Sequence, residues 1–258
     1  MGFHVVIPAR YASTRLPGKP LLDIGGKTMI QRVVEQACES GADEVLVATD
    51  DERIASAVHD PRRRGRAIAM MTDPALPSGT DRVAAVAEAR GWSEDTLVVN
   101  VQGDEPFLPP AIIGHAATLL ERDAAAGIAT LAVPVESLEE FLDPNAVKVV
   151  TAADGAALYF SRAPIPWSRD GASSGLTSQR EFDGAWRHVG LYAYRVGVLR
   201  EITRLPPSGL ERLEKLEQLR ALEHGVRIVV GHCVERPPSG VDTMADLERA
   251  RHRAALMA

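Results

Sequence analysis

The sequence has few of the residues and patterns on which several common protein classes depend. It contains only two cysteines, Cys38 and Cys233, among 258 residues. That is too few for a disulfide framework, and neither lies in a Cys/His spacing typical of zinc ligands. No apolar stretch approaches the roughly 18 residues needed to span a bilayer, and no charged and apolar leader precedes the first strand-like segment. We therefore expect a cytoplasmic protein with no membrane association.

Basic residues are in the minority as well. Lys and Arg number 29 against 35 Asp and Glu, which gives a formal net charge of −6. General nucleic-acid binders need a basic surface that releases counterions from phosphates, so this balance argues against nucleic acid as a partner. It leaves room for a local basic pocket that binds a small anion. The basic run Arg62–Arg66 is interpreted as a solvated loop.

The usual nucleotide-binding and esterase motifs are missing or lie in the wrong context. GxGxxG does not occur in the sequence, and the one GxSxG match, Gly171–Gly175, lies in a Gly/Ser-rich loop instead of at a strand-to-helix turn. The stretch Gly25–Thr28 resembles the end of a Walker A loop, but Leu21 stands where that motif has its first glycine. Dinucleotide-binding, P-loop and esterase functions of the common kinds are therefore excluded.

The sequence does contain a regular alternation of strand-like and helix-like segments. Hydrophobic residues make up 45% and charged residues 25% of the chain, which is typical of a globular protein, and the length suits a single α/β domain over residues 1–258. The predicted strands are short and apolar at successive positions, as strands buried on both faces are. They are Phe3–Pro8, Glu44–Thr49, Arg66–Met71, Thr96–Val101 and Ile128–Val135. Amphipathic helices between them, one of them capped by Thr80, predict a mostly parallel sheet covered by helices.

From about Pro134 the alternation loosens. We interpret residues 134–195 as a smaller β-rich arm, a subsidiary layer that could carry a dimer contact. The segments predicted after Pro134 are the strands Val147–Thr151, Ala157–Phe160 and His188–Tyr194, a Gly/Ser-rich loop Ser168–Gln179, a helix Leu210–Glu223, a strand Arg227–Cys233 and a closing helix Met244–Met257.

The loop after the first strand carries three cations. Arg10, Arg15 and Lys19 follow the strand that ends at Pro8, with small residues between them. Arginine binds phosphate oxygens in pairs and lysine adds a point charge, so this loop suits a triphosphate at the carboxyl end of the strand. A basic surface loop is the alternative that spacing alone leaves open.

A carboxylate follows another buried strand. The strand Thr96–Val101 leads through Gly103 to Asp104, on the same edge of the predicted sheet as the cationic loop. A carboxylate there could hold Mg²⁺, which bridges triphosphate oxygens. The competing interpretation is that Asp104 only shapes a turn.

Eight segments, in order along the whole chain, resemble the 3-deoxy-manno-octulosonate (Kdo) cytidylyltransferases, or CMP-Kdo synthetases. Several are long enough to be specific to this family, whereas Arg62–Arg66 and Ser168–Gln179 match least well. The matching segments are Ile7–Leu21, Ser78–Arg82, Asn100–Pro106, Asn145–Val150, Tyr159–Trp167, His188–Tyr192, Leu216–Arg220 and Gly240–Thr243.

The resemblance implies a nucleotide-diphospho-sugar transferase-like fold and an activity. The enzymes of this family transfer CMP from CTP to Kdo and release pyrophosphate, with Mg²⁺ as the cofactor. The product serves lipopolysaccharide biosynthesis, so a Gram-negative bacterial cytoplasm is implied, and a homodimer is expected.

The resemblance also implies a role for each matching residue. Arg10, Arg15 and Lys19 would hold the triphosphate, with Lys19, Arg10 and Asp104 central to catalysis. The cytidine would lie against Ala9, Ser78 and Gly79, and the metal would bind Asp104 and Asp242. The residues that would contact the sugar are Gln102, Arg162, His188, Tyr192, Glu217 and Gln218.

Without the family resemblance, the sequence allows a second interpretation for four of these residues. Asp242 precedes a helix and could be its N-cap. His188 would more often be a hydrogen-bonded core histidine. Glu217 could simply pair with Arg220 three residues further along a helix. Arg162, at a strand end before a proline-rich segment, could bind a carboxylate with both prongs or form an ordinary surface ion pair.

Three rival functions are weighed against Kdo activation. CMP-sialic acid synthetases carry a more glycine-rich first loop than Arg10–Arg15, so they rank second, ahead of hexose-1-phosphate nucleotidyltransferases. A nucleotide-binding regulatory protein on the same scaffold should lack carboxylates that hold a metal. The presence of Asp104 and Asp242 argues against this function. The sequence offers no enzyme nucleophile, so the sugar hydroxyl is expected to attack the α-phosphate in line, without a covalent intermediate.

Overall fold

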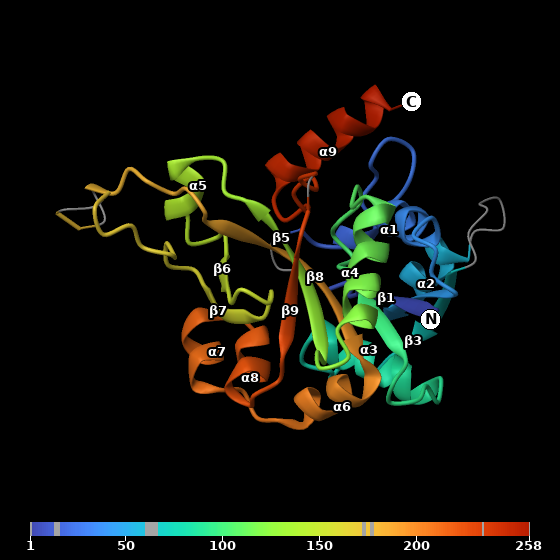
Figure 1. The fold of residues 1–258 in the computed structure, drawn as a ribbon. Coiled ribbons are helices and arrows are strands. Elements are labelled where there is room, and N and C mark those ends of the chain that lie inside the picture. Colours follow the sequence, from blue (N-terminus) through green and yellow to red (C-terminus); the bar gives the residue numbers. More distant parts are fainter. Residues whose placement is uncertain are drawn as a thin grey trace.

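The computed structural model describes residues 2–12, 16–59, 67–171, 174–175, 178–233 and 235–257. Figure 1 shows a central twisted sheet with helices packed around it. The strands within the described residues are β1 (Phe3–Ala9), β2 (Glu44–Thr49), β3 (Ala67–Met71), β4 (Leu97–Asn100), β5 (Ile128–Pro134), β6 (Lys148–Thr151), β7 (Ala157–Ser161), β8 (Trp186–Arg195) and β9 (Ile228–His232). The helices are the 3-10 turn η1 (Lys19–Leu21), α1 (Met29–Cys38), α2 (Glu52–Val58), α3 (Gly79–Ala89), α4 (Pro110–Arg122), α5 (Leu138–Leu142), α6 (Val196–Arg204), α7 (Gly209–Glu214), α8 (Gln218–Glu223) and α9 (Met244–Leu256).

The sheet is mixed, and its main path runs β3-β2-β1-β4-β8-β5-β9. The β1–β2, β2–β3, β1–β4 and β5–β9 pairs are parallel. One strand, β8, lies antiparallel between β4 and β5. The predicted helix-covered and mostly parallel sheet is confirmed. The strand at residues 188–194, which the sequence grouped with the arm, lies inside the main sheet.

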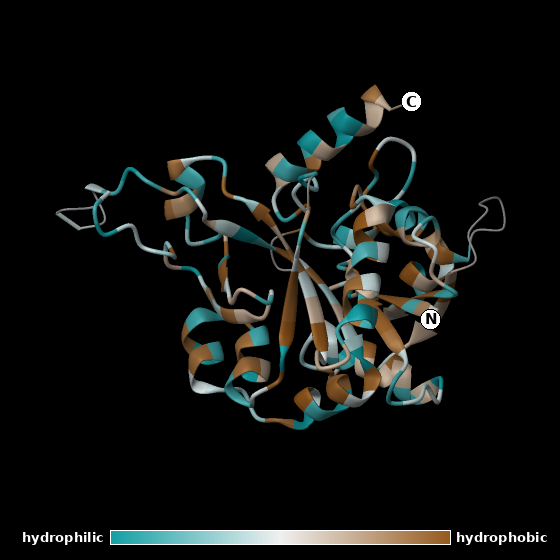
Figure 2. Ribbon diagram, in the orientation of Figure 1, coloured by the Kyte–Doolittle hydropathy of each residue, from teal (hydrophilic) through white to brown (hydrophobic). Residues whose placement is uncertain are grey.

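Successive residues of the strands pack into different layers. Val5 and Ile7 of β1 face a core shared with α1 and α4, whereas Val6 faces a second core shared with α3 and α6. Strand side chains alternate in direction, so both faces must be apolar when helices cover both. Figure 2 shows the central strands and the facing sides of the helices as mostly hydrophobic. This double burial explains why the strands carry unbroken apolar runs.

The β-rich region beyond Pro134 extends from one side of the sheet. The hairpin of β6 and β7 joins β8 through the register pairs Lys148–Arg187 and Val149–Trp186. Figure 1 shows β7 next to α7 and α8, whereas α5 lies farther from them, beyond β6. The role of this region in a dimer stays a prediction. No helix in the described part of the chain is long and apolar enough to cross a membrane.

Two local expectations about helices are wrong. The predicted helix over 210–223 is broken, because Lys215 adopts a left-handed conformation, with φ 55°, between α7 and α8. The N-cap of α3 is Ser78 rather than Thr80, since Ser78 and Asp81 form a reciprocal capping box. Both differences place side chains in the candidate site.

Candidate active site

The site lies where the carboxyl ends of β1 and β4 meet. These strands are parallel neighbours, so the loops that follow them leave the sheet on the same edge. Gly103 allows the second loop to pack closely, because a Cβ there would lie 2.8 Å from the carbonyl oxygen of Pro8. Only glycine fits such an approach without a shift of the backbone. Asp104 is thereby brought to the end of β1.

A hydrogen bond joins this loop to the segment before α9. The backbone N–H of Val241 donates to the carbonyl oxygen of Asp104 at 2.9 Å. The cap of α9 is Thr243, which forms a capping box with Asp246. The N-cap interpretation of Asp242 is therefore wrong, and its carboxylate lies beside Asp104.

Lys19 connects the two aspartates. Its Nζ donates to Asp104 Oδ2 at 2.6 Å and to Asp242 Oδ1 at 3.0 Å. The Lys19 side chain is 14% exposed, whereas those of Asp104 and Asp242 are 32% and 49% exposed. Burial alone lowers the pKa of Lys19, but the two carboxylates outweigh it and the pKa is raised. Lys19 is therefore a fully charged cation at neutral pH.

The two aspartates offer oxygen ligands of the kind that Mg²⁺ prefers. Because both bind the same ammonium group, their oxygens already converge on one cation position. Within the described residues no cluster of three or more His, Cys, Asp or Glu side chains could hold a metal. Two protein carboxylates suffice for Mg²⁺, which usually keeps several waters and takes further oxygens from substrate phosphates. The residues present therefore fit a magnesium ion that binds together with a triphosphate.

Sequence reasoning missed Glu105 and Arg187. Both line a cavity of about 550 Å³ together with Asp104 and Asp242. Burial, with repulsion from Asp104 added, raises the pKa of Glu105 to about 8. Arg187 donates to Glu140 Oε1 at 3.1 Å. Glu105 follows Asp104 directly, but nothing in the sequence indicates that its side chain is partly buried.

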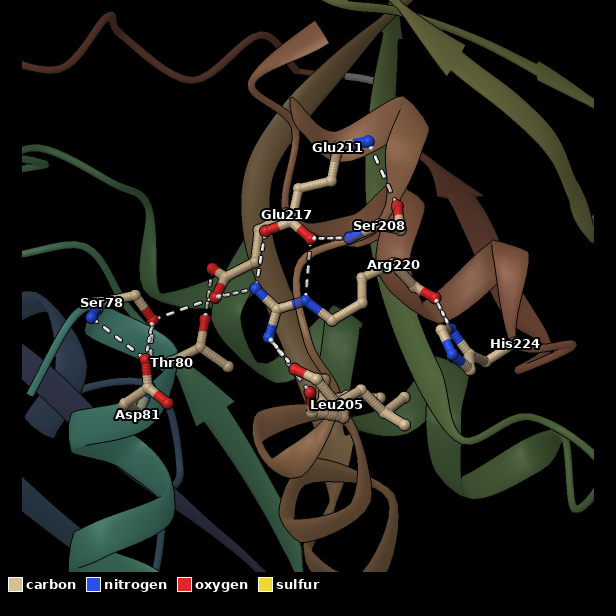
Figure 3. Close-up of polar contacts among 10 residues, drawn as sticks. Ser78, Thr80, Asp81, Leu205, Ser208, Glu211, Glu217, Arg220 and His224 are labelled. Atoms are coloured by element: carbon tan, nitrogen blue, oxygen red, sulfur yellow. Dashed lines mark hydrogen bonds and ion pairs between the residues drawn. The ribbon is translucent and has the colours of Figure 1, made fainter. Parts of the chain in front are cut away.

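A second group of polar residues lies between α3 and the α7–α8 pair (Figure 3). The Ser78 and Thr80 hydroxyls lie 2.9 Å and 2.8 Å from the two carboxylate oxygens of Glu217. The expected pair of Glu217 with Arg220 exists, but at 4.0 Å. Ser78 and Glu217, predicted to contact different substrates, are therefore direct neighbours.

Strand β8 contributes His188 and Tyr192, whose ring centroids are 5.2 Å apart. The Thr130 hydroxyl lies 2.9 Å from His188 Nε2 and 2.7 Å from the carbonyl oxygen of Leu191. A carbonyl can only accept, so Thr130 gives its proton to Leu191 and His188 Nε2 donates to Thr130. Burial, with the charge of Arg187 added, lowers the pKa of His188 to about 3. His188 is thus a neutral imidazole with Nδ1 left as an acceptor.

Burial also raises the pKa of Tyr192 well above its ordinary value, so its hydroxyl stays a donor. Arg162 follows β7 and is held by backbone groups. Its Nε donates to the carbonyl oxygen of Glu214 at 2.6 Å, and its Nη1 donates to that of Pro144 at 2.9 Å. The interpretation of Arg162 as an ordinary surface ion pair therefore finds no support in these contacts.

The remaining predicted residues fall into three groups. Ala9 ends β1, with Arg10 directly after it, and Gly79 and Gln218 are the first residues of α3 and α8. Gln102 Nε2 donates to Asn100 Oδ1 at 3.5 Å, a long contact just past β4. Arg15 and the basic run at 62–66 lie outside the described residues, as does part of the 168–179 loop.

Comparison with known proteins places this geometry in a family. A family model described as cytidylyltransferase matches residues 4–228. A 3-deoxy-manno-octulosonate cytidylyltransferase of Aeromonas salmonicida is 54% identical over 255 residues, which cover 97% of this chain and 98% of that protein. That of Methylococcus capsulatus is 54% identical over 250 residues, covering 96% and 95%. A solved CMP:2-keto-3-deoxy-manno-octonic acid synthetase complexed with CTP is 41% identical with a TM-score of 0.88, covering 100% of both chains. A nucleotidyl transferase from Methanothermobacter, at 16% identity and a TM-score of 0.62, shares the fold alone.

Proposed function

The chain belongs to the 3-deoxy-manno-octulosonate cytidylyltransferase family, and from that premise we propose that it transfers CMP from CTP to the anomeric hydroxyl of Kdo, releasing pyrophosphate. One observation of the site carries most weight. Lys19, Asp104 and Asp242 meet at the carboxyl ends of β1 and β4, where open α/β sheets bind their ligands.

The reaction is a direct displacement at phosphorus. The sugar hydroxyl attacks the α-phosphorus of CTP, a new oxygen–phosphorus bond forms, and the bond to the β-phosphate breaks. The hydroxyl proton passes to water, and the leaving pyrophosphate keeps the electron pair of the broken bond. Such a transfer requires positioning and charge stabilisation and no enzyme nucleophile.

Lys19, Arg10 and Arg15 are the residues that we assign to the triphosphate, and Ala9, Ser78 and Gly79 those that we assign to the cytidine. Lys19 directs two of its three ammonium donors at Asp104 and Asp242. A metal ion that compensated the charge of the aspartates would release these donors to phosphate oxygens, which is consistent with joint binding of nucleotide and metal.

Asp104 and Asp242 are the residues that would hold Mg²⁺. When bound there, the ion would neutralise charge on the phosphate oxygens. The two aspartates would orient the triphosphate through it.

The sugar would be bound by six residues whose chemistry suits a hydroxylated acid. Arg162 supplies a guanidinium for the carboxylate, His188 an acceptor nitrogen, Tyr192 a donor hydroxyl and Glu217 a carboxylate that accepts hydroxyl protons. Gln102 and Gln218 complete the set with amides that both donate and accept.

The wider setting follows from the family. We propose a homodimer that acts in the cytoplasm and supplies lipopolysaccharide biosynthesis. A CMP-sialic acid synthetase is the second candidate, because it performs the same transfer on another keto-sugar acid.

Pyrophosphate release tests the proposal. Purified protein is mixed with CTP, Mg²⁺ and either Kdo or N-acetylneuraminate, and pyrophosphate is measured with an enzyme-coupled assay. Rapid release with Kdo, lost on adding EDTA and restored by Mg²⁺, is expected. Release with N-acetylneuraminate and none with Kdo would show that the substrate assignment is wrong.

A further inference from the structure

The Glu217 carboxylate lies between two competing sets of partners. On one side it faces the hydroxyls of Ser78 and Thr80, at 2.9 Å and 2.8 Å. On the other side, Arg220 Nη2 is 4.0 Å from Glu217 Oε1. A shift of roughly 1 Å would turn that separation into a direct charged hydrogen bond. The ion pair between Glu217 and Arg220 is therefore long, and Glu217 is held short of a direct hydrogen bond to the guanidinium (Figure 3).

Arg220 is kept from Glu217 by a different carboxylate. Its Nε donates to Glu211 Oε2 at 2.8 Å and its Nη2 to Glu211 Oε1 at 2.6 Å, the two-pronged geometry that fixes a guanidinium most firmly. The Arg220 side chain is only 12% exposed. Its remaining nitrogen, Nη1, donates to the carbonyl oxygens of Ile202 and Leu205 at 3.2 Å and 3.4 Å. Glu211 therefore occupies the edge of the guanidinium that would otherwise attract Glu217.

The hydroxyls on the other side are not equivalent. The Ser78 Oγ also lies 2.7 Å from Asp81 Oδ2, and because a hydroxyl has one proton it can donate to only one of the two carboxylates. The Thr80 hydroxyl, in contrast, donates to Glu217 Oε2 at 2.8 Å, and no second carboxylate among the described residues takes its proton. Thr80 is therefore the more dependable donor to Glu217.

This arrangement leaves Glu217 capacity for a ligand. Each carboxylate oxygen has two acceptor positions, and the hydroxyls use at most one on each. The carboxylate also borders a cavity of about 580 Å³, which Ser78, Thr203, Glu211 and Arg220 line as well. A carboxylate drawn into a bidentate pair with Arg220 would lose both its orientation and its free acceptor positions.

We propose that Thr80 and Glu211 are positioning residues for Glu217: the Thr80 hydroxyl holds its carboxylate, and Glu211 keeps Arg220 occupied so that Glu217 remains available to a sugar hydroxyl. This inference rests on the proposed function, in which Glu217 contacts Kdo. Neither residue touches the substrate in this arrangement. Both act by preventing a close, hydrogen-bonded pair between Glu217 and Arg220, which would compete with the substrate.

Thr80→Val tests the first half, because valine keeps the shape and removes the donor. The KM for Kdo should rise about tenfold, the scale of a lost hydrogen bond to a charged group, while the KM for CTP changes less than about twofold. Thr80→Ser restores the hydroxyl and should return the KM for Kdo towards that of the unmodified enzyme. Thr203→Val is the matched control, because Thr203 lines the same cavity but donates to the carbonyl oxygen of Leu199. It should leave both KM values unchanged.

A double-mutant cycle tests the second half. Glu211→Gln should raise the KM for Kdo about five- to tenfold, because the freed Arg220 captures Glu217. Adding Arg220→Met removes the competitor, so the double variant should have a lower KM for Kdo than Glu211→Gln alone. A purely structural role predicts the opposite, since two lost contacts would add. Thermal unfolding of each variant confirms that the compared proteins are folded.

Glu217→Gln separates this inference from the function on which it rests. If the unmodified protein makes no product from Kdo, the proposed function and this inference both fail. If Glu217→Gln leaves the KM for Kdo unchanged, Glu217 does not contact the sugar and the inference alone is overturned. It is also overturned if Glu217→Gln raises that KM while Thr80→Val and Glu211→Gln do not.

Discussion

At the proposed phosphate end of the site, which consists of Lys19, Asp104 and Asp242, unlike charges hold one another directly. At the proposed sugar end, which consists of Arg162, His188, Tyr192 and Glu217, the polar groups are held by neighbouring parts of the scaffold. Arg162 donates to backbone carbonyls, and His188 to the Thr130 hydroxyl. The first end presents charges that are paired with one another, whereas the second presents donors and acceptors already fixed in direction.

This difference predicts how the two ends respond to substitution. Charge at the reacting phosphates stabilises the transition state, so a change at the phosphate end should lower kcat. Orientation at the sugar end serves binding, so a change there should raise the KM for Kdo. Each of the following substitutions tests whether kcat or the KM for Kdo changes.

The largest effect is expected for Asp104→Asn. Losing several kcal/mol of charge stabilisation around the metal corresponds to a kcat lower by roughly 10³-fold or more. The variant should stay folded, and its affinity for Mn²⁺ in the presence of CTP, measured by electron paramagnetic resonance, should fall as well. Asp242→Asn should behave in the same way.

Asp154→Asn is the matched control. Asp154 is also an ion-paired aspartate, 2.9 Å from Arg227, but it lies in the turn between β6 and β7. Normal turnover of Asp242→Asn would remove that residue from the metal site and leave Asp104 as the only aspartate assigned to it.

Lys19→Ala should have the next largest effect. Loss of one preorganised charge typically lowers kcat by about 10²–10³-fold, and steady-state kinetics with both substrates measures it. The KM for Kdo should change little. If only the KM for CTP rises, Lys19 binds ground state and transition state equally. The proposed phosphate end would then contribute to substrate binding alone, as the proposed sugar end is expected to do.

Arg162→Ala should raise the KM for Kdo by about 10- to 100-fold, with CTP binding nearly intact. Two of the five guanidinium donors already bind carbonyls, which leaves the others for a carboxylate. Arg162→Lys should rescue only partly, because lysine cannot supply a planar fork. Separate titrations of Kdo and CTP distinguish the two substrates, and an unchanged KM for Kdo would place the carboxylate elsewhere.

Much of the fold and of the phosphate end could be predicted from sequence. Strands buried on both faces carry unbroken apolar runs, so β1, β2 and β4 were located closely. Asp104 could be placed because it follows a buried strand beside a glycine. Asp242 contacts Lys19 across 223 positions of the chain, a contact that the sequence does not predict. Only the family resemblance implied a role for Asp242 in metal binding, since locally a helix cap was the simpler interpretation.

The errors concern features that tertiary contacts decide. The segment around Lys215 consists of good helix formers, and no Gly or Pro marks the break between α7 and α8. The observed contacts of Glu217 with α3 and of Arg220 with Glu211 offset the cost of a left-handed lysine. In the same way, the placement of β8 between β4 and β5 depends on strand neighbours that side-chain periodicity does not encode.

The smallest expected effect concerns pH and the buried histidine of the sugar end. Because burial lowers the pKa of His188 to about 3, the folded protein keeps this ring neutral between pH 7 and pH 4. The unfolded chain binds a proton there below about pH 6.5. The stability contributed by neutral His188 is therefore fully present above that pH and is lost as the pH falls towards 3, by at most about 1.4 kcal/mol per pH unit.

His188→Asn isolates this contribution, because asparagine can donate to Thr130 without titrating. Thermal unfolding of both proteins between pH 8 and pH 5 gives the comparison. The unmodified protein should lose more stability than the variant over this range, so that any difference in Tm at pH 8 shifts in favour of the variant at pH 5. Other histidines with lowered pKa, such as His4, cancel because both proteins contain them. Parallel curves would mean that folding does not lower the pKa of His188, and the proposed sugar end would then carry a charge at pH 5.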